Sequence, residues 1–149
     1  MRKSIQNKTF TQKISKNHRY KKKVKFASKA IIIENNNYLL QLRDNKKNIL
    51  YPNKWCFFGG TLKKNETPEI CIKRELKEEL SIRIKIVMKI YECLNYKTNT
   101  YLNYFYIKSI SEINKKNLTE GQNLGWFSKE KIKVLKKTPD IKIFENYLN

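Results

Sequence analysis

The acidic residues of this chain are concentrated in one short segment. Five of its 13 Asp and Glu residues lie between positions 66 and 79, although the 149 residues include 33 Lys and Arg and carry a formal net charge of +20. These five are Glu66, Glu69, Glu75, Glu78 and Glu79. Carboxylates held close together repel one another unless a cation neutralises them. The segment therefore predicts a divalent metal site.

A helix over residues 68–80 is predicted to carry most of these carboxylates. Thr67 can cap its first turn, Pro68 suits the first helical position, and Glu69 complements the positive end of the helix dipole. The helix has to end near Leu80, after which the sequence changes to an alternating pattern typical of a strand.

The predicted helix has an apolar arc and, beside it, an acidic arc. Ile72, Leu76 and Leu80 recur every fourth residue and would face the core. The adjoining arc carries three carboxylates at i, i+3 and i+4, namely Glu75, Glu78 and Glu79. Such oxygen ligands suit Mg²⁺ or Mn²⁺ better than zinc. The alternative is a solvent-exposed helix in which the Lys and Glu side chains of KRELKEEL form i,i+4 pairs.

Strands and further helices are predicted on both sides of this helix. Residues 24–34 and 38–43 are expected to form a hairpin around an Asn-rich turn at 35–37. Further strands are predicted at 55–58, 83–94, 101–108 and 124–127, and two C-terminal helices follow Ser128, the second at 139–148. Strands interspersed with helices indicate an α/β or α+β fold packed in layers. Gly59 and Gly60, two of only four glycines, indicate a backbone bend or a close approach to a ligand.

The segment from Gly60 to Ile82 reads GTLKKNETPEICIKRELKEELSI. It resembles the signature of the Nudix hydrolase superfamily, in which Gly, five residues, Glu and seven residues precede Arg-Glu-aliphatic-x-Glu-Glu-x-Gly-aliphatic. The matching positions are Gly60, Glu66, Arg74, Glu75, Leu76, Glu78, Glu79 and Ile82. Ser81 replaces the last Gly, a change that costs about 1 kcal/mol at a left-handed helix end and alters no carboxylate.

The resemblance extends on both sides of this signature. The aromatic-rich segment 55–60 and the segment 120–128 also look like parts of the family, so that the resemblance spans residues 26–148. It implies one Nudix domain over residues 24–149, folded as an α/β/α sandwich with a mixed β-sheet between helices.

The resemblance also implies an activity and a set of roles. The expected reaction is Mg²⁺-dependent hydrolysis of a phosphoanhydride bond in a nucleoside diphosphate linked to another moiety, such as a nucleoside triphosphate or a nucleotide sugar. By similarity, Glu78 and Glu79 bind the metal, Glu75 is a ligand or the general base, and Arg74 orients Glu75. Gly59 is expected to offer its carbonyl to the metal. Glu120, in a late loop, is a candidate base by position alone, and its alternative is an ordinary exposed acid.

Substrate specificity is harder to predict from the sequence. Five aromatic residues could stack on a base, although core packing is favoured for each one: Tyr51, Trp55, Tyr104, Tyr106 and Trp126. Arg43 and the lysines of the 44–54 loop could contact phosphates, with solvent exposure as the alternative.

The basic residues are spread over the chain and include an N-terminal arm. Residues 1–23 hold nine Lys and Arg and no acid, which predicts a loosely attached basic arm. This arm lacks the apolar region of a secretory signal, and it is rich in Lys where an organelle transit peptide favours Arg. Because 28 of the 33 basic residues are Lys, a solvated surface is favoured over a nucleic-acid interface.

The remaining composition limits compartment and partners. Cys56, Cys71 and Cys93 form no CxxC pair, and His18 is the single histidine, so neither a disulfide scaffold nor a zinc site is expected. A reducing, cytoplasmic location fits best. The longest apolar run has four residues, whereas a membrane span needs about 20. The expected partner is a small nucleotide, and a homodimer is compatible with the sequence.

Three alternatives to a small-nucleotide hydrolase are retained. Removal of pyrophosphate from an RNA 5′ end is compatible with the positive charge, although nucleic acid is not the favoured partner. An isoprenoid-diphosphate isomerase shares the fold but usually has a degenerate signature. A non-catalytic nucleotide- or RNA-binding regulator would be expected to lack metal-site glutamates, and none is missing here.

Overall fold

The computed structural model describes residues 23–149, which fold around one seven-stranded sheet. The strand order is β3-β2-β1-β6-β5, with β4 paired to β1 and β7 paired to β2. The elements are β1 (Lys25–Glu34), β2 (Asn37–Leu42), β3 (Trp55–Cys56), β4 (Gly59–Thr61), α2 (Pro68–Leu80), β5 (Ile84–Asn95), β6 (Thr100–Ser109), the 3-10 helix η1 (Lys115–Asn117), β7 (Asn123–Ser128), α3 (Lys129–Val134) and α4 (Pro139–Leu148).

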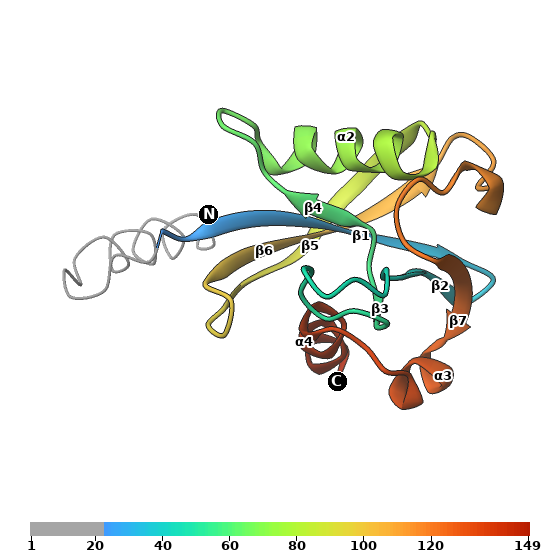
Figure 1. The fold of residues 1–149 in the computed structure, drawn as a ribbon. Helices are drawn as coiled ribbons and strands as arrows, with labels where there is room; N and C mark the ends of the chain where they lie inside the picture. The colour runs from blue at the N-terminus through green and yellow to red at the C-terminus, as the bar shows by residue number, and fades with distance from the viewer. Residues whose placement is uncertain (1–22) are drawn as a thin grey trace.

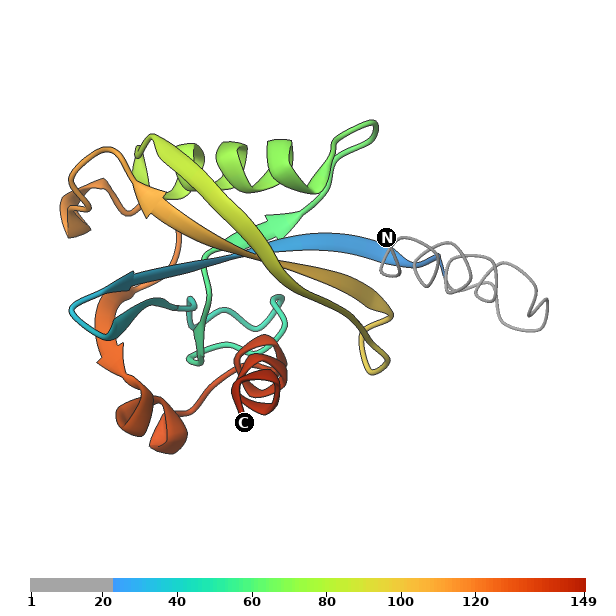
Figure 2. The ribbon, with the colours of Figure 1, turned by 180° about the vertical axis from the view of Figure 1, so that it is seen from behind.

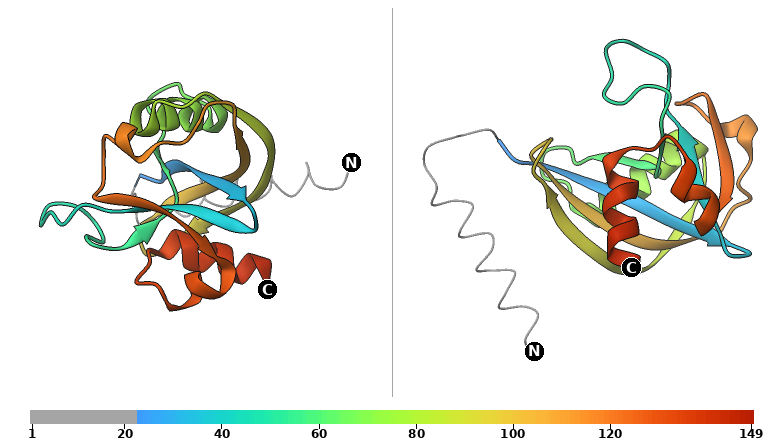
Figure 3. Two further views of the ribbon diagram at one scale, coloured as in Figure 1. Left: turned by 90° about the vertical axis from the view of Figure 1, so that its right-hand side faces the viewer. Right: turned by 90° about the horizontal axis from the view of Figure 1, so that it is seen from below.

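Helices cover both faces of the sheet. Figure 1 and the left panel of Figure 3 show α2 on one side and α3 with α4 on the other. Strands β1 and β6 are parallel, whereas the other named pairs are antiparallel. The long strand β5 pairs with β6 at the edge of the sheet (Figure 2). The predicted α/β/α sandwich with a mixed sheet is confirmed.

Strand β1 is buried on both faces, which explains its apolar run. Ala30 and Ile32 belong to the core beneath α2, whereas Ala27 and Ile31 belong to the core beneath α3 and α4. Alternate side chains of a strand point to opposite faces, so a strand covered on both sides requires apolar residues in succession. The central strand thus separates two cores.

Two local predictions differ from the structure. In the hairpin, Asn35 and Asn36 alone form the turn, with φ of 48° and 61°, and Asn37 already begins β2. Two left-handed residues give a turn whose twist matches that of the strands. The strand predicted at 55–58 is only Trp55–Cys56.

Gly59 and Gly60 lie in a strand that begins directly after a bend at Phe58. They belong to β4, which pairs antiparallel with β1 through Lys29 and Ser28. Gly59 has a φ of 127°, and a Cβ there would lie 2.0 Å from the Ser28 carbonyl oxygen. The close approach at Gly59 is therefore to the backbone of β1.

The predicted basic arm falls on residues 1–22, outside the described residues, and on Lys23. Across residues 23–149, no helix combines the length and the apolar character needed to cross a bilayer.

Candidate active site

Helix α2 is fixed at both ends, and this positions its carboxylates. The Thr67 hydroxyl accepts a hydrogen bond from the Ile70 N–H at 3.2 Å, as the sequence predicts. The Ser28 hydroxyl of β1 donates to the Pro68 carbonyl at 2.7 Å, which ties the helix start to the central strand. At the other end, Ser81 adopts a left-handed φ of 55° and its N–H donates to the Lys77 carbonyl.

Strand β4 lies directly against the acidic arc of α2. A Cβ on Gly60 would lie 2.4 Å from Oε1 of Glu75, so only glycine leaves room for this carboxylate. The Gly59 N–H donates to Oε2 of Glu79 at 3.2 Å. The two adjacent glycines therefore give α2 the space and the hydrogen-bond donor that two of its glutamates need.

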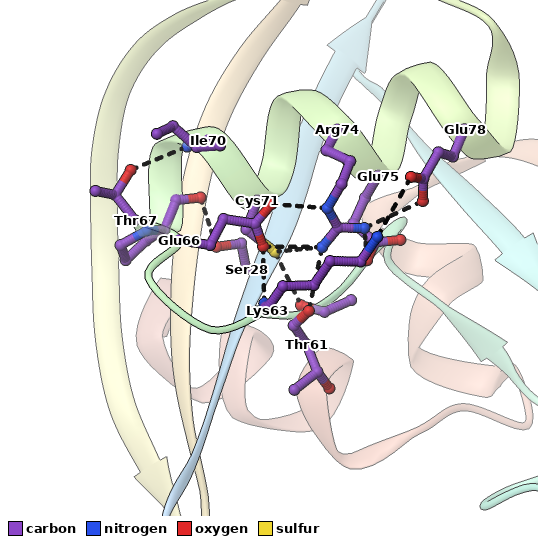
Figure 4. A network of polar contacts seen from close by, with 12 residues as sticks. Ser28, Thr61, Lys63, Glu66, Thr67, Ile70, Cys71, Arg74, Glu75 and Glu78 are labelled. Atoms are coloured by element: carbon purple, nitrogen blue, oxygen red, sulfur yellow. Dashed lines mark hydrogen bonds and ion pairs between the residues drawn. The ribbon is translucent and has the colours of Figure 1, made fainter.

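Arg74 joins three of the acidic residues (Figure 4). Its Nε and Nη2 atoms donate to both carboxylate oxygens of Glu66, at 2.7 and 3.0 Å. Its Nη1 atom donates to Glu75 at 2.7 Å and to Glu78 at 3.1 Å. Hydrogen bonding to Arg74 lowers the pKa of Glu66 to about 2. The i,i+4 ion pair of this helix is thus formed by Arg74 and Glu78. With Glu66 the guanidinium forms a bidentate ion pair.

Glu79 is the buried member of the group. Only 4% of the residue is exposed, whereas 54% of the Glu78 side chain is exposed. Burial, followed by repulsion from Glu75, raises the pKa of Glu79 to about 8, although the Gly59 N–H and Lys29 act in the opposite direction. The protein alone therefore stabilises the Glu79 anion poorly, and a bound cation would correct this.

The donor chemistry fits a hard divalent cation. Glu75, Glu78 and Glu79 supply oxygen atoms from one arc of α2, as Mg²⁺ and Mn²⁺ prefer. In the described part of the chain, no three Asp, Glu, Cys or His side chains are gathered around a single point as ligands. The oxygens of Glu75 and Glu78 instead face the Arg74 guanidinium, at 2.7 and 3.1 Å. A cation would have to compete with Arg74 for them.

The loop before β7 brings Glu120 to the same end of α2. The Thr119 N–H donates to the Glu79 carbonyl at 3.0 Å, and the Thr119 hydroxyl donates to the Glu78 carbonyl at 2.8 Å. The Gln41 side chain fixes the Glu120 carbonyl at 2.6 Å. The charge of Glu120, an exposed residue, adds slightly to the raised pKa of Glu79.

A cavity of about 220 Å³ adjoins Gly59 and Gly60. Its lining includes Lys29, Arg43, Tyr51 and Asp140. Of the five aromatic residues considered as stacking partners, only Tyr51 lines this cavity. Tyr104 is fully buried and its hydroxyl donates to the Asp140 carbonyl, while Trp55 and Trp126 pack against the cores.

Sequence reasoning missed Lys29 and Asp140. The Lys29 Nζ lies 3.9 Å from Oδ2 of Asp140, with side chains only 14% and 9% exposed. Burial lowers the pKa of Lys29, but the attraction of Asp140, with smaller contributions from Cys56 and Glu79, outweighs it and raises the pKa above its ordinary value. One signal could have revealed Lys29, because it interrupts the apolar side-chain positions of a buried strand between Ala27 and Ile31.

Known proteins share both the sequence pattern and the fold. The family model described as the NUDIX domain matches residues 25–147. The solution structure of the E. coli ORF135 protein is 23% identical, with a TM-score of 0.70 over 85% of this chain and 89% of that chain. A MutT NUDIX hydrolase from Burkholderia pseudomallei is 18% identical, with a TM-score of 0.69 over 86% and 100%.

A third similar structure is that of a protein named for its enzymatic activity. An ADP-ribose pyrophosphatase from Streptococcus suis is 17% identical, with a TM-score of 0.57 over 70% of this chain and 73% of that chain. At these identities the neighbours establish the fold, and the family assignment comes from the model that covers nearly all described residues. The chain therefore belongs to the Nudix hydrolase family.

Proposed function

We propose that this protein is a Mg²⁺-dependent pyrophosphohydrolase that cleaves a phosphoanhydride bond in a nucleoside diphosphate linked to another moiety. Nucleoside triphosphates and nucleotide sugars are the expected substrates. The proposal builds on the family assignment, which makes the chain a hydrolase of acid anhydrides. The observation that carries it is the buried carboxylate of Glu79, which lies against the Gly59 N–H and is poorly stabilised as an anion by the protein itself.

Glu75, Glu78 and Glu79 are the residues proposed to hold the ion, together with the Gly59 carbonyl. A divalent ion bound there would supply charge neutralisation for the diphosphate oxygens and a lower pKa for a coordinated water. The Gly59 N–H holds Glu79 in place at 3.2 Å, and Arg74 fixes Glu75 at 2.7 Å.

Two residues are candidates for taking the proton from the attacking water. Glu75 lies on the acidic arc and is 15% exposed, so water reaches it. Glu120 lies in the loop that Thr119 ties to the end of α2. Attack on phosphorus breaks the bridging phosphoanhydride bond, and a nucleoside monophosphate leaves with the rest of the phosphate chain or its substituent as the second product.

The neighbours' names are compatible with this substrate class. One is named an ADP-ribose pyrophosphatase and another a MutT NUDIX hydrolase. Both names refer to those proteins, and they guide the choice of substrates to be tested.

A substrate panel tests the proposal. Nucleoside triphosphates, nucleotide sugars, dinucleoside polyphosphates and 5′-triphosphorylated RNA would be incubated with and without Mg²⁺, and the products identified by chromatography. We expect Mg²⁺-dependent release of a nucleoside monophosphate from at least one small substrate. Glu79→Gln should lower this activity by about 100-fold or more, since it removes an anionic ligand.

Glu69→Gln provides the matched control. Glu69 is an exposed glutamate in the first turn of the same helix, so its substitution should leave the rate unchanged. Equal activity of Glu79→Gln and the wild type would refute the proposed metal site. Cleavage of the RNA alone would replace the small-nucleotide proposal by RNA 5′-end processing, and salt-dependent RNA binding without any cleavage would indicate a regulator.

A further inference from the structure

Lys29 is a largely buried cation whose hydrogen-bond donors are not used by the fold of the described residues. Its side chain is 14% exposed, and within residues 23–149 its ammonium donates no hydrogen bond and has one ion pair, at 3.9 Å to Asp140. A buried ammonium is stabilised when its N–H groups find acceptors. Lys29 lines the cavity beside Gly59 and Gly60, so an acceptor from a bound molecule can reach it.

A purely structural ion pair does not account for this arrangement. The Phe57 N–H donates to Oδ2 of Asp140 at 3.2 Å, and the Thr138 hydroxyl donates to Oδ1. These bonds hold Asp140 at the start of α4 whether or not Lys29 is present. Lys29 therefore balances the charge of Asp140 but is not needed to satisfy its hydrogen bonds.

The position of Lys29 connects the cavity to the acidic arc. Lys29 is paired with Gly59 between β1 and β4, and the Gly59 N–H donates to Glu79. One strand thus separates the cavity from the glutamates. Gly59 and Gly60 contact the glutamates and also line the cavity, so a nucleoside attached to phosphates held at the glutamates, as the proposed function requires, would have this cavity beside it.

The charges around Lys29 favour a neutral ligand over a phosphate. A phosphate bound to Lys29 would lie close to the buried Asp140 carboxylate and be repelled by it. A neutral heterocycle carries no such penalty, and its keto oxygen is a good acceptor for an ammonium. An amino group at the same place would meet the ammonium donor to donor. The cavity has a volume of about 220 Å³, against roughly 30 Å³ for one molecule of liquid water, so it is larger than a site for a single water.

We propose that Lys29 is a specificity-determining residue, whose ammonium donates a hydrogen bond to a keto oxygen of the substrate's nucleobase in this cavity. The inference rests on the proposed function for the placement of the phosphates. The protein should therefore prefer nucleotides whose base carries a keto group over nucleotides whose base carries an amino group at the same ring position.

Two matched nucleotide pairs test this assignment. Inosine and adenosine triphosphates differ in the purine at a 6-keto or 6-amino group, with the N1 proton that accompanies the keto form, and uridine and cytidine triphosphates differ in the same way at position 4. We expect the wild type to have a kcat/KM roughly tenfold higher for the keto member of each pair, and Lys29→Met to bring both ratios close to one. Lys25→Met, an exposed lysine of the same strand, should keep the wild-type ratios.

The ratio of kcat/KM between the keto and the amino nucleotide separates recognition of the base from a change in rate that is common to all nucleotides. Lys29 also lowers the pKa of Glu79, so its loss could change the rate with every nucleotide, but such a change would leave the keto-to-amino ratio unaltered. A ratio that is the same in the wild type and in Lys29→Met overturns the inference. If Lys29→Met fails to fold because Asp140 becomes an unpaired buried charge, the Lys29→Met/Asp140→Asn double variant serves for the same comparison.

A binding experiment keeps the inference separate from the proposed function. Calorimetry with non-hydrolysable α,β-methylene analogues of inosine and adenosine triphosphate, in the presence of Mg²⁺, measures the preference without turnover. Binding with the expected preference but no cleavage of any substrate would refute the proposed function and support the role of Lys29. Cleavage with no keto preference, or no nucleotide binding at all, would refute the role of Lys29.

Discussion

Gly60 and Glu75 lie in direct contact across the interface between β4 and α2. A Cβ at position 60 would lie 2.4 Å from Oε1 and 2.6 Å from Cδ of the Glu75 carboxyl group. The same carboxylate accepts a hydrogen bond from Arg74 at 2.7 Å. Its position is therefore set on one side by the absence of a side chain and on the other by a guanidinium.

Gly60→Ala should displace the Glu75 carboxylate and leave the fold intact. The backbone at Gly60 has no positive φ, and the atoms in the way belong to the end of a flexible side chain. We therefore expect little change in Tm but a loss of activity of about 100-fold, the scale expected when a reacting group is misplaced by about 1 Å. Steady-state kinetics and thermal unfolding measure the two quantities.

A double-mutant cycle that combines Gly60→Ala with Glu75→Gln identifies the cause of that loss of activity. If Gly60→Ala acts by moving Glu75, adding it to Glu75→Gln should lower the activity little further. Losses that multiply in the double variant would place the effect elsewhere.

Arg74→Lys is expected to reduce activity although it preserves the charge. Arg74 donates to three carboxylates through a planar fork, whereas a lysine ammonium is a point charge that cannot hold all three. A loss of about 10-fold to 100-fold in kcat/KM is expected, with weaker Mg²⁺ binding measured by titration. Lys73→Met, at the exposed neighbouring position, should have no effect. Full activity in Arg74→Lys would mean that the fork geometry is dispensable.

Local signals in the sequence were sufficient for α2 and insufficient for its surroundings. The predicted helix 68–80 coincides with Pro68–Leu80 because Thr67 and Pro68 act on adjacent residues. Strand β4 was not predicted, since a Gly-Gly pair usually interrupts a strand and its pairing partner in β1 is about thirty residues away. Close packing explains why these glycines form a strand, because a side chain at Gly59 or Gly60 would collide with β1 or with α2.

Site residues that are close in the sequence were likewise predicted, whereas those that meet only through the fold were not. Glu75, Glu78 and Glu79 were predicted from spacing within one helix and Arg74 from the family resemblance, and Arg74 contacts Glu66, Glu75 and Glu78 in the structure. Lys29 and Asp140 were missed because they meet only in the folded domain, and one lysine among 28 carries little signal. The different burial of Glu78 and Glu79 also depends on β4, which no pattern within the helix describes.

Ser81→Gly should stabilise the protein. Ser81 ends α2 with a φ of 55°, a left-handed conformation that costs a residue with a Cβ about 1 kcal/mol relative to glycine. We expect Ser81→Gly to raise Tm by about 3 °C, measured by calorimetry, with unchanged activity. Ser81→Ala keeps the Cβ and serves as the control, which should show no such gain. A lower Tm in Ser81→Gly would mean that chain entropy in the unfolded state outweighs the relief of strain.

The burial of Glu79 predicts how stability depends on pH in the metal-free protein. The pKa of Glu79 is raised from 4.5 to about 8 in the folded state. Between these values the folded protein retains a proton that the unfolded chain has released. The stabilisation from this proton is therefore complete below pH 4.5 and is lost as the pH rises toward 8, by roughly 2–4 kcal/mol.

Glu79→Gln should lack this dependence, because an amide does not titrate. With a chelator present, the free energy of unfolding of the wild type, measured in urea, should fall relative to that of Glu79→Gln between pH 5 and pH 8. Mg²⁺ at pH 8 should restore stability to the wild type by binding the anion, and it should have less effect on Glu79→Gln. Glu69→Gln should follow the wild type at every pH. Parallel curves for the wild type and Glu79→Gln would show that Glu79 is already stabilised as an anion without a metal.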